Sequence, residues 1–135
     1  MPTWPLPQPA VKVAIAILTE AMDPVLVSAR MPKTRPLQFV RVDRVGGSMP
    51  TPVTDISRLL VECFASDMAT AEDMTAQARQ ALRNAGGSIV AGAFVRGWTG
   101  EQGPVSFDDP TVTDQRRWQF TGDLHISTKG TTEGS

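Results

Sequence analysis

The sequence predicts an α+β fold in which one mainly antiparallel sheet carries two helices packed on one of its faces. Three observations lead to this prediction. Two segments show the apolar spacing of an amphipathic helix, and a segment near the C-terminus alternates apolar and polar residues as a strand does. The predicted order is a helix, two or three strands, a second helix and further strands. Antiparallel pairing with both helices on one face buries all the apolar stripes together.

A first helix is predicted to have Pro9 in its first turn and to end at Asp23-Pro24. Proline is favourable in the first turn of a helix, where its missing N–H has no intrahelical partner to lose. A short strand, Val25–Met31, follows and is closed by Pro32. The apolar face of the helix is predicted to comprise Val11, Ala14, Ile15, Leu18 and Met22.

Two further strands, Leu37–Val45 and Ser57–Ala65, contain charges at positions where a buried sheet would hold apolar residues. Such charges must be paired, solvated or set against a partner subunit, because burying an unpaired charge is prohibitive. We expect Gly46–Pro52 to form a loop between the strands, since prolines cannot donate to a ladder and long connections often carry function. The embedded charges are Arg41, Asp43, Arg44 and Glu62.

The second helix is predicted to begin at Thr70–Asp73, which resembles a capping box, and to end at Gly86-Gly87. Small residues on its apolar side predict close approach of this helix to the sheet. That side is expected to comprise Ala71, Met74, Ala78, Leu82 and Ala85.

The C-terminal part predicts a strand over Ile89–Trp98, bent or interrupted at its glycines, and a turn over Thr99–Pro104. A short strand could start at Val105–Phe107, before a turn at Asp108–Pro110. The final strand alternates most cleanly, which predicts one buried face and one wet face. Its predicted buried residues are Trp118, Phe120, Gly122, Leu124 and Ile126, and its wet residues are Gln119, Thr121, Asp123 and His125.

A chain of 135 residues fits one domain of common size. We expect an extended proline-rich arm over residues 1–9, with Trp4 as an anchor, and a single α+β domain over residues 10–127. Residues 128–135 are polar and rich in glycine and threonine, which predicts a disordered tail.

Composition narrows the function classes. Hydrophobic content of 41% and charged content of 20% are typical of a globular protein, and a net charge of −1 argues against a general nucleic-acid binder. The apolar run Ala10–Leu18 contains Lys12 and is too short to span a bilayer, so neither a secretory signal nor a membrane partner is predicted. We therefore expect the protein to fold in a cytoplasm.

No catalytic or metal-binding pattern emerges. The single cysteine, Cys63, lies in an apolar strand, and the single histidine, His125, is not linked to it by any motif. Asp108-Asp109 precedes a proline and favours a turn over a cation site. We predict no cofactor, no metal and no enzymatic activity. A polar pocket around Asp123, His125 and Cys63 would indicate a small-molecule-binding or enzymatic domain instead.

Three stretches occur in an order and spacing that resembles the tail terminator proteins of long-tailed, siphovirus-type phages, especially phages of actinobacteria. They are Phe39–Gly47, Thr54–Asp67, and Gly103–Pro110 ahead of Arg117–Phe120. The resemblance implies an α+β subunit that forms a hexameric ring on the head-proximal end of the tail tube. In that family the ring stops tube polymerisation and offers a surface to the head–tail connector, without catalysis or a cofactor. Another neck or tail-completion subunit is the alternative.

The partners implied are further copies of the chain, the major tail tube protein and the connector protein, in a virion assembled in the host cytoplasm. No sequence-specific nucleic acid is expected. Rim charges tune the specificity of an interface more than its affinity, so the embedded charges are candidates for setting the register between subunits. The candidate interface residues are Arg41, Asp43, Arg44, Gly46, Gly47, Met49, Glu62, Arg116 and Arg117.

Overall fold

The computed structural model of the chain describes residue 6 and residues 9–128. The predicted arm and tail therefore lie largely outside the described residues, and the domain bounds stay predictions. The elements are α1 (Ala10–Met22), β1 (Leu26–Ser28), β2 (Phe39–Thr51), β3 (Thr54–Ala65), α2 (Met68–Asn84), β4 (Ile89–Val90), β5 (Ala93–Ser106) and β6 (Arg116–Ser127).

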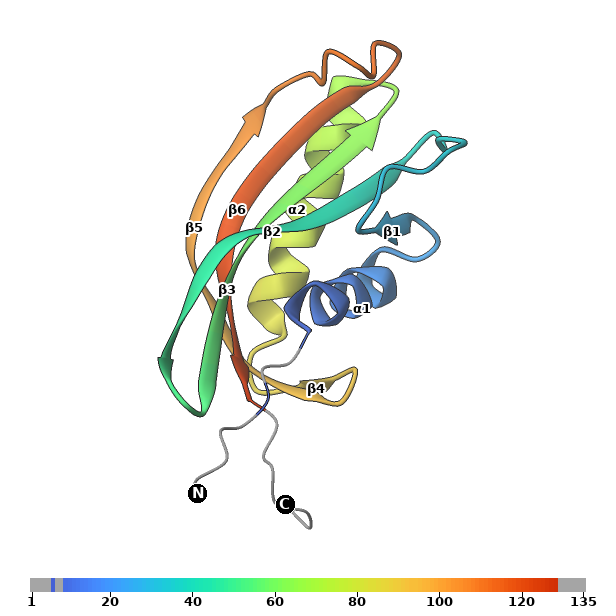
Figure 1. The fold of residues 1–135 in the computed structure, drawn as a ribbon. Helices are drawn as coiled ribbons and strands as arrows, with labels where there is room; N and C mark the ends of the chain where they lie inside the picture. The colour runs from blue at the N-terminus through green and yellow to red at the C-terminus, as the bar shows by residue number, and fades with distance from the viewer. Residues whose placement is uncertain (1–5, 7–8, 129–135) are drawn as a thin grey trace.

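The six strands form one sheet in the order β1-β2-β3-β6-β5-β4 (Figure 1). Every neighbouring pair is antiparallel except the short outer pair β1 and β2, which is parallel. The predicted α+β class is confirmed, with a sheet that is mixed because of this one pair. Four long strands, β2, β3, β6 and β5, make up its body.

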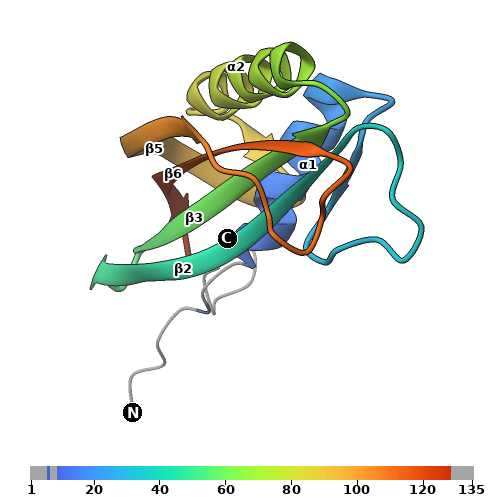
Figure 2. The same cartoon turned by 90° about the horizontal axis from the view of Figure 1, so that it is seen from above.

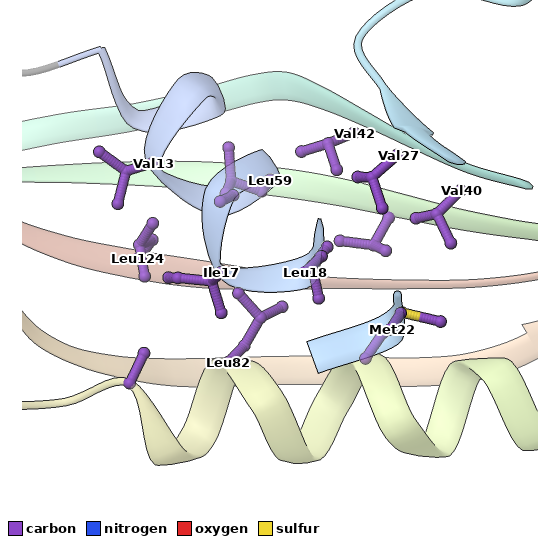
Figure 3. Close-up of a cluster of buried hydrophobic side chains, with 14 of the residues drawn as sticks. Val13, Ile17, Leu18, Met22, Val27, Val40, Val42, Leu59, Leu82 and Leu124 are labelled. Carbon is purple, nitrogen blue, oxygen red and sulfur yellow. The ribbon is translucent and has the colours of Figure 1, made fainter. Parts of the chain in front are cut away.

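Both helices lie on the same side of the curled sheet (Figure 2). The core fills the space between them and the sheet, and α1 lies over its centre, where Leu18 is fully buried (Figure 3). The predicted apolar face of α1 was partly wrong, because Val13 and Ile17 point into the core while Val11 and Ile15 are only half-buried. The residues predicted for α2 are all buried, namely Ala71, Met74, Ala78, Leu82 and Ala85.

The start of α2 differs from the prediction. Asp67 is the N-cap residue, and its side chain accepts hydrogen bonds from the backbone N–H of Thr70 at 2.8 Å and from its hydroxyl at 2.9 Å. The predicted capping box at Thr70–Asp73 was therefore wrong by about one turn. A carboxylate at the N-cap satisfies a free amide of the first turn as well as a hydroxyl does, and Asp67 was available earlier.

The segment predicted as a loop, Gly46–Pro52, is mostly strand. β2 continues to Thr51 and turns directly into β3, with register shifts after Arg44 and after Ser48. The glycines are accommodated at the bulges. Pro50 is tolerated because no described strand pairs with the outer side of β2 at that point, so its missing N–H costs no hydrogen bond of the sheet. The result is a long hairpin, which we call the β2–β3 hairpin.

The turn predicted at Thr99–Pro104 is likewise inside a strand, because β5 runs through it with three register shifts against β6. Gly100 and Gly103 take up positive φ angles of 63° and 93° at these irregularities. The chain does turn at Ala91-Gly92, which separates β4 from β5 and agrees with the predicted interruption.

Trp98, in the middle of β5, packs against the neighbouring strand β6. Its ring packs edge-on against Phe120 and lies over Gly122, where a side chain would overlap the indole. Its Nε1 donates to Glu101 at 2.9 Å, and the same carboxylate is held by Arg79 and Arg83 of α2. One residue thus joins the core, the bulge of β5 and the outer side of α2.

Replacing Gly122 with alanine is expected to destabilise the fold by about 1–3 kcal/mol, because the new methyl group must displace the Trp98 ring from a close-packed site. Denaturant unfolding followed by circular dichroism measures this. The matched control is Gly97→Ala, since an added Cβ there meets open space. Equal stability of the two variants would contradict the packing described.

Glu101 is expected to make stability depend on pH. Burial alone would raise its pKa, but the hydrogen bonds from Trp98 and Arg79 and the charges of Arg79 and Arg83 outweigh burial and hold the pKa below its ordinary value. A lowered carboxyl pKa contributes stability above the ordinary pKa and loses it as pH falls through the folded value. The stability advantage of the wild type over Glu101→Gln should therefore shrink on acidification, measured by thermal unfolding. An advantage that stays constant with pH would contradict this.

Candidate assembly surfaces

The side of the sheet that faces away from the helices carries a network of charged and polar side chains, and we call it the open face. It is formed by alternate residues of the four long strands, including Arg41, Arg58, Glu62 and Asp123. One end of it is covered, where Phe39 and Phe64 stack under the segment that contains Val112.

Glu62 lies at the centre of the first charge cluster and is almost fully buried, with 4% of its side chain exposed. Arg117 approaches its Oε2 at 2.7 Å, and Arg41 approaches its Oε1 at 2.9 Å. The Arg41 N–H is not aligned with that oxygen, so the contact is an ion pair without a hydrogen bond. Arg117 also reaches Asp109 at 3.5 Å and lies over the rings of Phe64 and Phe107. The cluster balances two positive and two negative charges within one chain.

Arg58 organises a second network along the open face. Its guanidinium donates to the Gly100 carbonyl at 3.2 Å, Asp123 at 3.0 Å, Gln102 at 2.9 Å and Thr121 at 3.0 Å. These bonds link β3, β6 and β5. Arg58 is not among the interface residues predicted from the sequence. Its place in the alternation of β3, opposite the buried Ser57 and Leu59, was the available signal.

The candidate interface residues do not form one patch. Arg41, Glu62 and Arg117 meet in the cluster around the glutamate. Arg116 pairs with Asp108 at 2.7 Å, near the end of the sheet where β6 begins. The remaining candidates lie along β2, and they are Asp43, Arg44, Gly46, Gly47 and Met49.

Along β2, Arg44 donates to the Gly46 carbonyl at 3.0 Å and lies 3.7 Å from the buried Asp55. Gly47 has φ +137°, and a side chain there would overlap the Ile56 carbonyl and the Arg44 guanidinium. Asp43 is exposed and, within the described part of the chain, has no ion-pair partner.

Both ends of the molecule expose apolar side chains, which at the end opposite the hairpin include Leu37 and Phe107, and the two ends differ in their exposed ion pairs. The hairpin end exposes apolar side chains on the β2–β3 hairpin, and β4 lies at the same end (Figure 1). The opposite end consists of the segments that lead into β2 and β6, and it carries exposed ion pairs such as Arg35 with Asp114. The exposed apolar residues at the hairpin end are Val45, Met49, Val53, Ile89 and Phe94.

The long strands β2 and β5 each present a free edge beyond the short strands β1 and β4. β1 pairs only with Phe39–Arg41 of β2, and over the rest of β2 no described strand lies on the outer side. β4 pairs with Ala93 and Phe94 of β5, and Ser88 and Gly87 bond to Val95. From Gly97 onward, the described strands leave the outer side of β5 without a partner. Free strand edges are surfaces on which another chain can pair.

The structure does not form the polar pocket that would have indicated a small-molecule-binding domain. Cys63 belongs to the core side of the sheet, whereas Asp123 and His125 lie on the open face. Burial raises the pKa of Cys63 to about 12, so its thiol is protonated at neutral pH and a poor nucleophile. His125 bonds to Thr99 at 2.7 Å, and Asp123 pairs with Arg58.

Other kinds of site were also sought. Residues 9–128 contain no group of three or more histidine, cysteine or carboxylate side chains placed to hold a metal ion. A groove of about 520 Å³ lies where α1, α2 and β4 meet, and small or aliphatic side chains such as Ile17, Ala81 and Ala85 form most of its lining. None of the described helices is long and apolar enough to span a membrane.

Comparison with known proteins supports the fold. No family model and no curated protein matches the sequence. Among solved structures, the fold is similar to that of a chain in the virion of a native gene transfer agent particle. The TM-score is 0.61 and the identity 14%, and the match covers 87% of this chain and 91% of that chain. The likeness establishes a shared fold.

Replacing Glu62 with alanine is expected to cost about 3 kcal/mol or more, because it leaves Arg117, itself only 12% exposed, without its closest counter-charge. The matched control is Asp114→Ala, which removes an exposed partner of Arg35 and should cost less than about 1 kcal/mol. Urea unfolding of both variants measures the difference. Similar small losses in both would show that the Glu62 cluster does not contribute as a buried pair.

Proposed function

We propose that the chain is a structural virion protein without enzymatic activity, and that it acts as the tail terminator of a long-tailed phage or phage-like particle. Copies of the chain form a ring, hexameric as in the family that the sequence resembles, on the head-proximal end of the tail tube. The ring stops tube polymerisation and offers its other side to the head–tail connector. The protein is assembled in the host cytoplasm and resides in the virion.

The observation that carries the proposal is the fold shared with a virion chain over most of both lengths. The sequence stretches that resemble tail terminators support it independently of that fold comparison. The charge clusters on the open face support a role based on shape, because their charges are paired within the chain.

The exposed ion pairs at one end support a subunit with two different partners, because the hairpin end lacks exposed pairs of this kind among the described residues. The hairpin end, with Met49 and Val53 exposed, suits a permanent contact, and we assign it to the tube. The end with exposed ion pairs suits recognition of a separately assembled partner, because charges contribute specificity more than affinity. We assign that end to the connector.

Particles that lack this chain are expected to show tubes of uncontrolled length without heads, because the growing end is left uncovered. Electron microscopy of negatively stained lysates measures tube length. Adding the purified protein back should restore a fixed length and add density to the head-proximal end of the tube. Density at the connector with tubes already of normal length would support a neck or tail-completion subunit instead.

The double substitution Met49→Asp and Val53→Asp tests which end meets the tube. It should prevent capping of tubes while leaving the chain folded and able to self-associate, because both side chains are exposed. The control places a negative charge at the opposite end, as Leu37→Asp, at a residue that is 77% exposed. Capping by the hairpin variant with normal efficiency would overturn the assignment of this end.

A further inference from the structure

We propose that neighbouring copies join edge to edge, with the outer side of β2 of one copy paired against the outer side of β5 of the next. This inference rests on the proposed ring and names its subunit contact. A closed ring requires two different, complementary surfaces on each copy. The open face is a poor candidate, since Arg58 and Glu62 already form ion pairs with residues of the same chain there. The two free edges remain.

The topology fixes how the edges would pair. β2 is antiparallel to β3, β3 is antiparallel to β6, and β6 is antiparallel to β5. The two outer long strands therefore run in opposite directions. A contact that continues the sheet from one copy to the next without inverting it makes β5 and the neighbour's β2 an antiparallel pair, which is the more stable kind.

The two edges also match in length and in irregularity. On one side, six residues of β2, Asp43 to Ser48, face five of β3, Leu60 to Ile56. On the other side, six residues of β5, Gly97 to Gln102, face five of β6, His125 to Thr121. These five positions of β3 and β6 pair directly with each other. Each edge thus holds one extra residue at almost the same position along the sheet. Because both edges have the same irregularity, they remain equal in length.

A proline lies just beyond each of these two six-residue segments, which we together call the window. Pro50 follows it on β2, and Pro104 follows it on β5, with the two residues at opposite ends of the sheet. Because proline lacks a donor, pairing would stop there. Prolines and bulges usually protect an edge against uncontrolled pairing. Here they leave one segment of equal length free on each side, which favours one register over its alternatives.

Side chains at the ends of the window are complementary. Asp43, Leu60, Thr121 and Gln102 occupy one row across the sheet. Gln102 accepts a hydrogen bond from Arg58 through Oε1 at 2.9 Å, which leaves its amide N–H groups available. In a continued row, that amide lies beside the Asp43 carboxylate of the next copy. An exposed acceptor and an exposed donor then meet on the same face.

The edge-to-edge contact also orients the ring. Because it preserves strand direction, every β2–β3 hairpin points to the same side. The hairpin ends then form one face of the ring, and the ends with exposed ion pairs form the other. The contact is thus compatible with different partners above and below the ring.

Cysteine cross-linking tests this contact. Single variants Asp43→Cys and Gln102→Cys, mixed at high concentration with a short bis-maleimide, are expected to give a covalent dimer. The double variant is expected to give a ladder of oligomers that ends at the ring. Within one copy the two positions are three strand spacings, about 14 Å, apart, so a shorter linker cannot join them internally. Native Cys63 is buried and serves as the unreactive background.

A second pair at the other end of the window, Ser48→Cys with Gly97→Cys, should behave in the same way, since an added side chain at Gly97 meets open space. The control combines Asp43→Cys with Gly97→Cys. These positions lie at opposite ends of the window and should not cross-link. Light scattering on the same samples reports the assembly state. Rings that form without cross-links at either matched pair would overturn the edge contact and leave the ring intact. A chain that stays monomeric would overturn both.

Discussion

The rest of the structure depends on one constraint, which is that β3 lies in the middle of a sheet covered by helices on only one side. Its residues alternate between the core, where Leu59, Val61 and Cys63 are buried, and the open face, where Arg58 and Glu62 lie. Water does not reach Glu62 well, so its charge must be balanced by neighbours on both adjacent strands. This requirement ties β2, β3 and β6 into one register, which in turn places the edges and the hairpin.

Much of this arrangement was predictable because it follows from periodicity. The second helix and the last strand have unambiguous apolar spacing, and most residues expected to be buried are so, such as Leu82 and Leu124, while Trp118 is only half-buried. The boundaries were less predictable. Glycine and proline indicate turns in most sequences, yet Gly46–Pro52 and Thr99–Pro104 are strand, because bulges on outer strands absorb them. Whether a strand is central or outer depends on pairing far along the chain, which local sequence does not contain.

The candidate assembly residues show a similar division. The sequence correctly requires that Arg41 and Glu62 have partners, but it leaves open whether those partners belong to the same chain. Arg117, far along the sequence and on β6, supplies the missing charge. Charge alone therefore did not reveal an intersubunit surface. The free edges became visible only when the strand order was known, and with them the exposed Asp43 and Gln102.

The described chain ends at a place with a practical meaning. Thr128 donates its backbone N–H to the Val53 carbonyl at 3.0 Å and its hydroxyl to the Pro52 carbonyl at 2.7 Å. The end of β6 consequently lies beside the turn between β2 and β3. A bulky fluorescent or electron-dense tag attached there would label only one rim of the proposed ring. Micrographs would then show which way each ring faces.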